Sequence, residues 1–258
     1  MESAPTVNNI PPSNPVGAHR VRPQRNKRYF HTKEAKMLAY ISSNADNKII
    51  RALEDEGFIV APLPPFESLD APTGTHADML ICAVGKALFK HADYALAGDF
   101  KNISEPMSGK YPHDVRLNIA IVGKHAICNE KHASREILKH LIEEGYTVRH
   151  VKQGYAHCST CIVSENALIT ADEGIYAAAT SLGIDALKIH SGHISLPPYD
   201  YGFIGGASGT SDSAVYFCGS LERHPDGEQI RAFITSHGKR VVELSPSPLA
   251  DVGGILFI

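Results

Sequence analysis

Residues 76–89, HADMLICAVGKALF, and residues 114–127, DVRLNIAIVGKHAI, align with each other without a gap. Each stretch carries an apolar run, then a Gly-Lys pair, then a second apolar run. Two short apolar runs joined by a glycine-containing turn are typical of a β-hairpin. The sequence therefore predicts a repeated hairpin unit. Further copies follow at 156–169, at 202–218 and at 249–258.

Between these copies lie helical segments that each stop at a glycine and lead into a β-type run. They are 48–56 before Gly57, 135–144 before Gly145, 175–182 before Gly183 and 229–237 before Gly238. A glycine directly after a helical pattern is a helix C-cap signal. Residues 92–99 are short and broken by glycine, so the second unit is expected to have lost most of its helix.

The five units fill the chain from Met37 to Ile258. Units of this length bury their hydrophobic faces only by packing on their neighbours, around a ring or along an array. We therefore expect one α/β domain over residues 29–258. Residues 1–28 contain four prolines before Val16 and then a cluster of basic residues, without apolar periodicity. This composition predicts a disordered tail.

The composition is that of a soluble globular protein, because 43% of the 258 residues are hydrophobic and 21% are charged. A formal net charge of -3 gives no basic field that would attract nucleic acid or an anionic membrane. The longest apolar runs, such as 80–84, are far shorter than the roughly 20 residues that cross a bilayer. We therefore expect neither nucleic acid nor a membrane as a partner, and a cytoplasmic location.

The cysteines number five, an odd count spread along the chain: Cys82, Cys128, Cys158, Cys161 and Cys218. With no apolar signal sequence before them, a disulfide framework is not expected, and a reducing compartment is. Cys158 and Cys161 form a C-x-x-C pair, but no second pair follows that would complete a zinc site. We expect no metal and no organic cofactor.

Five units in this order resemble the pentein, or guanidino-group-modifying, fold, a five-bladed α/β propeller of ββαβ-type repeats. The strings KQGYAHCS at 152–159, YGFIGG at 201–206 and LADVGG at 249–254 are similar to an uncharacterised bacterial family assigned to that fold. The resemblance covers nearly the whole body of the chain. It implies a distant relation to arginine deiminases, dimethylargininases and amidinotransferases.

Characterised penteins use a nucleophilic cysteine, a histidine in an H-x-D motif and carboxylates that hold the guanidinium of the substrate. A guanidinium carbon is stabilised by resonance, so a thiolate has to attack it while carboxylates hold the cation in line. A histidine protonates the leaving amine and activates water. The resemblance thus implies a hydrolase or amidinotransferase that acts on the C–N bond of a small guanidino or amidine compound through a thiouronium intermediate.

His76-Ala77-Asp78 is an H-x-D motif at the start of an apolar run, and Cys158 occupies the equivalent place two units later. In the familiar enzymes the histidine lies in the third unit and the cysteine in the fifth, also two units apart. In a closed ring, a rotation by two units leaves this relation unchanged. The rotation requires an aspartate in the fifth unit, where Asp251 lies. We therefore predict Cys158 as nucleophile, His76 as general acid and base, and Asp78 and Asp251 as substrate-binding carboxylates.

The second unit offers further candidates for substrate binding. Asp114 and Asn118 occupy its ring-lining segment, and Arg116 could bind a substrate carboxylate through two hydrogen bonds. A structural salt bridge is the alternative for these residues. The glycines of the 205–209 segment are explained by close backbone packing at the centre of the propeller.

Several alternatives stay open at this point. Lys152 and Gln153 precede Cys158 and could lower the pKa of its thiol, although a solvated lysine is the default. His190 and His193 are alternative bases or simple polar groups of a loop. The final unit has no cysteine, whereas characterised enzymes carry theirs near the C-terminus. A ribosomal anti-association factor shares the fold without catalysis, so a non-catalytic binding protein is the alternative function. A homodimer also stays open.

Overall fold

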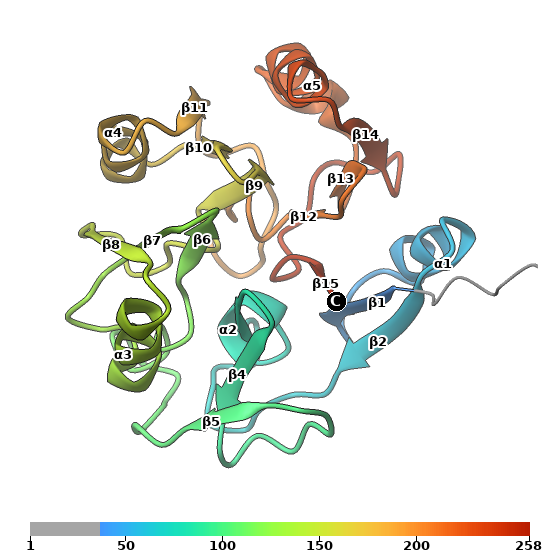
Figure 1. Cartoon of the computed structure of the whole chain (residues 1–258). Coiled ribbons are helices and arrows are strands. Elements are labelled where there is room, and N and C mark those ends of the chain that lie inside the picture. Colours follow the sequence, from blue (N-terminus) through green and yellow to red (C-terminus); the bar gives the residue numbers. More distant parts are fainter. Residues whose placement is uncertain (1–36) are drawn as a thin grey trace, which may run out of the picture. The chain divides into compact units, whose positions relative to one another are not determined.

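The computed structural model of the protein describes residues 37–258, which form five separate three-stranded sheets arranged around a common centre (Figure 1). The predicted tail, residues 1–28, and residues 29–36 lie outside the described residues. The strands are β1 (Leu38–Ser42), β2 (Ile59–Leu63), β3 (Cys82–Val84), β4 (Ala87–His91), β5 (Lys101–Ile103), β6 (Ala120–Val122), β7 (His125–Cys128), β8 (Thr147–His150), β9 (Thr160–Ser164), β10 (Ala167–Thr170), β11 (Asp185–Lys188), β12 (Ser208–Thr210), β13 (Ala214–Phe217), β14 (Arg240–Glu243) and β15 (Leu256–Phe257).

Every sheet is built in the same way. An inner strand pairs antiparallel with a middle strand, which pairs parallel with an outer strand. The sheet orders are β3-β4-β5, β6-β7-β8, β11-β10-β9, β12-β13-β14 and β15-β1-β2. A parallel pair needs a crossover connection, and four of the five sheets use a helix for it. These sheets confirm the five-bladed α/β propeller.

The two aligned stretches form hairpins, as their Gly-Lys pairs predict. In β3–β4 Val84 pairs with Ala87, and in β6–β7 Val122 pairs with His125. The intervening glycines have positive φ, 58° at Gly85 and 55° at Gly123, a conformation that costs a residue with a Cβ more than it costs glycine.

The crossover helices are α1 (Asn47–Asp55), α3 (Arg135–Glu143), α4 (Glu173–Ser181) and α5 (Gly227–Ser236). Each lies within one or two residues of its predicted bounds. At Gly145 and Gly183 φ is 75°, and a Cβ there would meet nothing within 4 Å. The left-handed backbone alone therefore explains these two glycines. The second sheet has no helix over residues 92–99, as expected.

The helices cover the outside of the ring because one face of each is apolar. In α3, Ile137 and Leu141 are fully buried, and they pack into a cluster with Val84 and Phe89 of the preceding sheet. The neighbouring sheets are held together by clusters of this kind. Among residues 37–258 no helix is both long and apolar enough to span a membrane.

The ring is closed by the end of the chain. β15 pairs antiparallel with β1, so that Ala39 lies opposite Phe257 and Tyr40 opposite Leu256. The last strand thus supplies the inner strand of the sheet that the first strand began. As a consequence, each sheet has one segment that leads into its inner strand at the centre of the ring (Figure 1). In chain order, these inner segments are 76–81, 114–119, 156–159, 202–207 and 251–255.

Candidate active site

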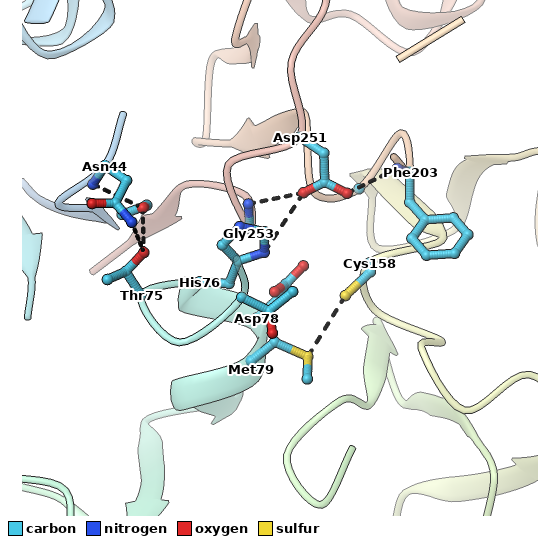
Figure 2. A network of polar contacts seen from close by, with 12 residues as sticks. Asn44, Thr75, His76, Asp78, Met79, Cys158, Phe203, Asp251 and Gly253 are labelled. Carbon is cyan, nitrogen blue, oxygen red and sulfur yellow. Dashed lines mark hydrogen bonds and ion pairs between the residues drawn. The ribbon is translucent and has the colours of Figure 1, made fainter. Parts of the chain in front are cut away.

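Four of the predicted site residues come together where the inner segments meet. Figure 2 shows the carboxylates of Asp78 and Asp251 between the imidazole of His76 and the sulfur of Cys158. His76 and Asp78 belong to the segment before β3, where α2 (Ala77–Leu80) forms one helical turn. Cys158 precedes β9, and Asp251 precedes β15. Three sheets that are distant in sequence therefore contribute to one group.

Asp251 is fixed by backbone donors. Its Oδ2 accepts a hydrogen bond from the amide of Phe203 at 2.8 Å, and its Oδ1 accepts one from the amide of Gly253 at 2.9 Å. The Nδ1 of His76 lies 3.8 Å from the same Oδ1. Burial raises the pKa of Asp251 to about 6, although the two amide donors act in the opposite direction.

Glycines make room for this carboxylate. A Cβ on Gly206 would lie 2.0 Å from the Oδ1 of Asp251, and one on Gly202 would lie 2.4 Å from its Cβ. A Cβ on Gly253 would lie 2.2 Å from the Cβ of His76. The YGFIGG and DVGG strings are therefore required by close packing around Asp251 and His76, and the same reason holds for Gly205 against the carbonyl of His157.

Asp78 is buried with only 3% of its surface exposed, and neither carboxylate oxygen has a hydrogen-bond partner. Burial and then the negative charge of Asp251 raise the pKa of Asp78 to about 7. A polar group buried without a partner costs free energy, so an unpaired carboxylate in this place disfavours the ligand-free state. Asp78 is thus the member of the group that is left most in need of a partner.

Asn118 is predicted to contact substrate, but in the structure its side chain forms hydrogen bonds within the protein. Its Oδ1 accepts from the amides of His157 at 2.7 Å and Cys158 at 3.2 Å. Its Nδ2 donates to the carbonyl of Asp78 at 3.1 Å and to the Sγ of Cys158 at 2.9 Å. With both ends of the amide occupied, Asn118 links the two segments that carry Asp78 and Cys158.

The thiol of Cys158 is buried, with 5% of the residue exposed. Burial, followed by the charges of Asp78 and Asp251, raises its pKa well above the usual value. Lys152 does not counter this effect, because its side chain is exposed, and Gln153 is engaged with Asp172. Lys152 is thus a solvated lysine, the default for this residue, and does not lower the pKa of the thiol in the ligand-free protein.

Aromatic side chains cover Cys158 where a pocket was expected. Cys158 belongs to an apolar cluster that includes Tyr155 and Phe203. These two rings stack at 6.1 Å, and Tyr111 follows at 5.9 Å from Tyr155. Cys158 lines neither of the two cavities beside it. One is an axial cavity of about 330 Å³ that touches Asp78 and His157, and the other, of about 190 Å³, touches Ser159.

Asp114 and Arg116 lie outside the central group. Asp114 accepts a hydrogen bond of 2.6 Å from the hydroxyl of Tyr155, and burial raises the pKa of this aspartate. It therefore holds the aromatic cover in place. Arg116 donates to the carbonyl of His132 at 2.9 Å and lies beside His113. The geometry gives Arg116 no contact with the group around Cys158.

The alternative bases form a second cluster. His190 faces Asp226, with its Nδ1 3.0 Å from both carboxylate oxygens, and His193 packs against His224 at a ring distance of 5.5 Å. Neither histidine joins the group around Cys158. Among residues 37–258, no group of three or more His, Cys, Asp and Glu side chains is arranged to hold a metal ion. Cys161, like Cys82, Cys128 and Cys218, lies in the core.

Comparisons with known proteins agree with this architecture. A family model described as a family of unknown function, DUF6873, matches residues 40–256. The chain belongs to this family. No curated protein matches the chain in sequence.

Two solved structures are similar in fold to this chain. One is a dimethylarginine dimethylaminohydrolase adduct, with a TM-score of 0.53, 14% identity, and coverage of 82% of this chain and 93% of the other. The second is the Pseudomonas aeruginosa dimethylarginine dimethylaminohydrolase, as a Cys-to-Ser mutant with citrulline. It has a TM-score of 0.53 and 14% identity, and covers 87% and 99% of the two chains. At this identity the likeness shows the pentein fold.

Sequence reasoning missed the residues that surround the group rather than form it. Tyr155 and Phe203 both lie inside strings that carry the family resemblance, but nothing in these strings says which side chain points inward. Met79, whose Sδ lies 4.0 Å from the Sγ of Cys158, follows the H-x-D motif directly. Of the three, Met79 and Phe203 lie within inner segments, and Tyr155 immediately precedes one.

Proposed function

We propose that this protein is a cysteine-dependent hydrolase or amidinotransferase that acts on a small guanidino or amidine compound. The observation that carries the proposal is the pair Asp78 and Asp251. Both are buried, and among residues 37–258 neither forms an ion pair with a lysine or an arginine. Buried carboxylates without a cation are costly, and a bound cation removes the cost.

A guanidinium or amidinium fits this requirement better than a compact ammonium. Its planar, delocalised cation presents N–H donors along its edges, in a geometry that matches carboxylate oxygens. Asp78 has both oxygens free to accept such donors. The Cys158 sulfur lies on the other side of this carboxylate from His76, so a planar cation held by Asp78 would lie beside the thiol (Figure 2).

The residues suggest how a reaction would proceed. Burial lowers the pKa of His76 to about 4, so the imidazole is neutral at pH 7 and can accept a proton. Binding of a cation beside Cys158 lowers the pKa of the thiol, because the positive charge stabilises the thiolate. The thiol proton passes to His76, whose imidazolium is stabilised by Asp251. The thiol of Cys158 is thus protonated in the ligand-free protein, and it is converted to the reactive thiolate only when the substrate is bound.

The chemistry then follows in two balanced halves. The Sγ of Cys158 forms a bond to the amidino carbon, and the bond from that carbon to one nitrogen breaks as His76 returns its proton to the leaving amine. Water next adds to the thiouronium carbon, giving one proton to His76. The carbon–sulfur bond breaks, the thiol regains its proton, and a urea or ureido product leaves. In a transferase, an acceptor amine replaces the water.

A substrate screen tests the proposal. Arginine, methylated arginines, agmatine and simple alkylguanidines are incubated with the protein, and released ammonia, amine or urea is measured. The Cys158→Ser variant should lose at least about a thousandfold in kcat. The Cys161→Ser variant, changed in the core three positions away, serves as the matched control. Intact-mass measurement after an acid quench should detect the thiouronium adduct on Cys158. If no compound is turned over, or if Cys158→Ser remains as active as the parent, the proposal fails.

The cover over Cys158 favours a second candidate, a non-catalytic protein that binds a guanidinium compound. Cys158 is 5% exposed, and burial raises the pKa of its thiol, so we expect the ligand-free thiol to react slowly. Calorimetry separates the two candidates: a binding protein takes up a guanidino compound without releasing product, and its affinity falls on Asp78→Asn but not on Cys158→Ala.

A further inference from the structure

The cavity of about 190 Å³ beside the candidate site lies between the segment before β9 and the segment 189–204. Its lining includes Gln153, Ser159, Asp172, Glu173, His190 and Phe203. We propose that this cavity receives the far end of the guanidino substrate, and that it selects a substrate whose far end is a primary ammonium. This inference rests on the proposed function and names the class of substrate within it.

The cavity lies next to the thiol along the chain and in space. Ser159 follows Cys158 directly, so their Cα atoms are about 3.8 Å apart. Phe203 packs in the same apolar cluster as Cys158 and also lines the cavity, so its side chain forms a wall shared by the two. The amide of this residue holds Asp251. A chain that extends from the amidino group past Phe203 would therefore enter this cavity.

One of the lining residues carries a buried hydroxyl without a partner. Ser159 is 3% exposed, and its Oγ makes no hydrogen bond. Buried hydroxyls in native proteins are nearly always satisfied, so an unsatisfied one that lines a cavity indicates a place for a ligand or a water. A hydroxyl oxygen can accept a hydrogen bond from an ammonium.

The charges of the lining select the sign of the ligand. Asp172 and Glu173 are the charged residues that line the cavity apart from His190, and the lining contains no lysine or arginine. Asp172 accepts from the amide of Ile175 and from Gln153, which leaves two of its lone pairs unused. Glu173 forms an ion pair with Lys188, a residue outside the lining. The net charge of the residues that line the cavity is therefore negative.

The other groups that face the cavity do not reverse this sign. The Nδ1 of His190 faces Asp226. Burial acts to raise the pKa of Asp226, but hydrogen bonds from the backbone and side chain of His190 outweigh it and keep this pKa below its usual value. The His190–Asp226 pair is therefore neutral when the imidazole is charged. Arg116, the residue predicted to bind a substrate carboxylate, is held at His132 instead. A carboxylate at the far end would meet the carboxylate of Asp172, which has no lysine or arginine beside it in the lining.

The test compares three guanidines of equal chain length that differ only in their far end: 4-guanidinobutylamine, butylguanidine and 4-guanidinobutanoate. The ammonium compound should have the highest kcat/KM, by about tenfold over butylguanidine, and the carboxylate compound the lowest. Asp172→Asn should lower kcat/KM for the ammonium compound about tenfold and so remove its advantage over butylguanidine. Asparagine is also a good N-cap, so α4 is retained. Ser159→Ala gives a second variant that leaves the helix cap intact. Asp185→Asn, at the exposed first position of β11 and outside the lining, is the matched control.

Binding to the Cys158→Ala variant separates the two proposals. If no guanidine is turned over but calorimetry shows tighter binding of the ammonium compound that Asp172→Asn abolishes, the far-end site stands and the proposed reaction is overturned. If turnover occurs and the carboxylate or neutral compound is used equally well or better, the far-end site is overturned and the reaction stands. If no compound reacts and none binds, both are overturned.

Discussion

Replacing Asp78 by asparagine should stabilise the ligand-free protein at high pH, although Asp78 is the residue most needed for binding a cation. The pKa of Asp78 is raised from its ordinary value of 3.8 to about 7 by burial and by Asp251. For a carboxyl whose pKa is raised on folding, the stabilising contribution is complete below the unfolded value. It is lost as the pH rises through the folded value, so the loss develops between about pH 4 and pH 7.

The size of the effect follows from these numbers. An increase from 3.8 to about 7 corresponds to about 4 kcal/mol of folding free energy at a pH above both values. An asparagine in the same place still leaves a buried amide without a partner, which costs about 1–3 kcal/mol. The net gain at pH 8 is then about 1–3 kcal/mol, or an increase in Tm of roughly 2–10 °C for a domain of this size. At pH 4 the gain disappears, and the variant is equal to or less stable than the parent.

Thermal unfolding followed by circular dichroism at pH 4, 6 and 8 measures this difference. Asp99→Asn is the matched control, since Asp99 is exposed in the loop before β5 and should shift Tm by little at any of the three pH values. Adding a guanidine should raise Tm of the parent more than that of Asp78→Asn. A variant that is destabilised by the same amount at all three pH values would refute the reasoning, because Asp78 would then have a partner in the folded protein.

Three further changes test the surroundings of the group. Gly206→Ala should lower the free energy of unfolding, measured in urea, by about 2–4 kcal/mol, because the added Cβ would lie 2.0 Å from Asp251. The control Gly145→Ala, where φ is 75° and the space is open, should lower it by about 1–2 kcal/mol. Equal losses for the two variants would contradict the packing argument. Asn118→Ala leaves the amides of His157 and Cys158 without an acceptor and should lower the free energy of unfolding by about 2–5 kcal/mol in the same assay. A decrease below about 1 kcal/mol would show that water replaces the side chain. Iodoacetamide at pH 7 should label Cys158 in the native, ligand-free protein far more slowly than in urea, by peptide mass spectrometry, since burial raises the pKa of its thiol; rapid native labelling would show an open site.

Much of the fold was readable from the sequence because its signals are local. A Gly-Lys pair between apolar runs specifies a hairpin in two of the units, and a glycine after an amphipathic segment ends a helix in four of them. The alignment of the units then defines the five blades. The group of His76, Asp78, Cys158 and Asp251 was inferred from the register of these repeats. Equivalent positions of a ring face the same centre, and the inner segments do meet there.

The roles of the neighbouring residues could not be read in the same way, since the inner segments are irregular and have no period that assigns a direction to each side chain. Asn118 and Arg116 are two residues apart, yet Asn118 binds Cys158 and Arg116 binds His132. The direction of the pKa shift of the thiol could not be read from the sequence either, because the proximity of Lys152 along the chain says nothing about burial. Desolvation depends on the complete packing of the site, including Phe203, which lies far from Cys158 along the chain.

The closure of the ring is what makes the proposed shift of the catalytic group by two blades geometrically equivalent to the arrangement expected from the pentein resemblance. β15 completes the sheet of β1, so every inner segment has neighbours on both sides and no blade is first or last in space. A histidine and a cysteine two blades apart then face each other in the same way wherever the count starts. The packing that supports the group depends on particular positions, because Asp251 requires glycine at 202 and 206, and His76 requires glycine at 253. A group displaced around the ring must therefore carry its glycines with it, and in this chain these glycines stand around Asp251 and His76.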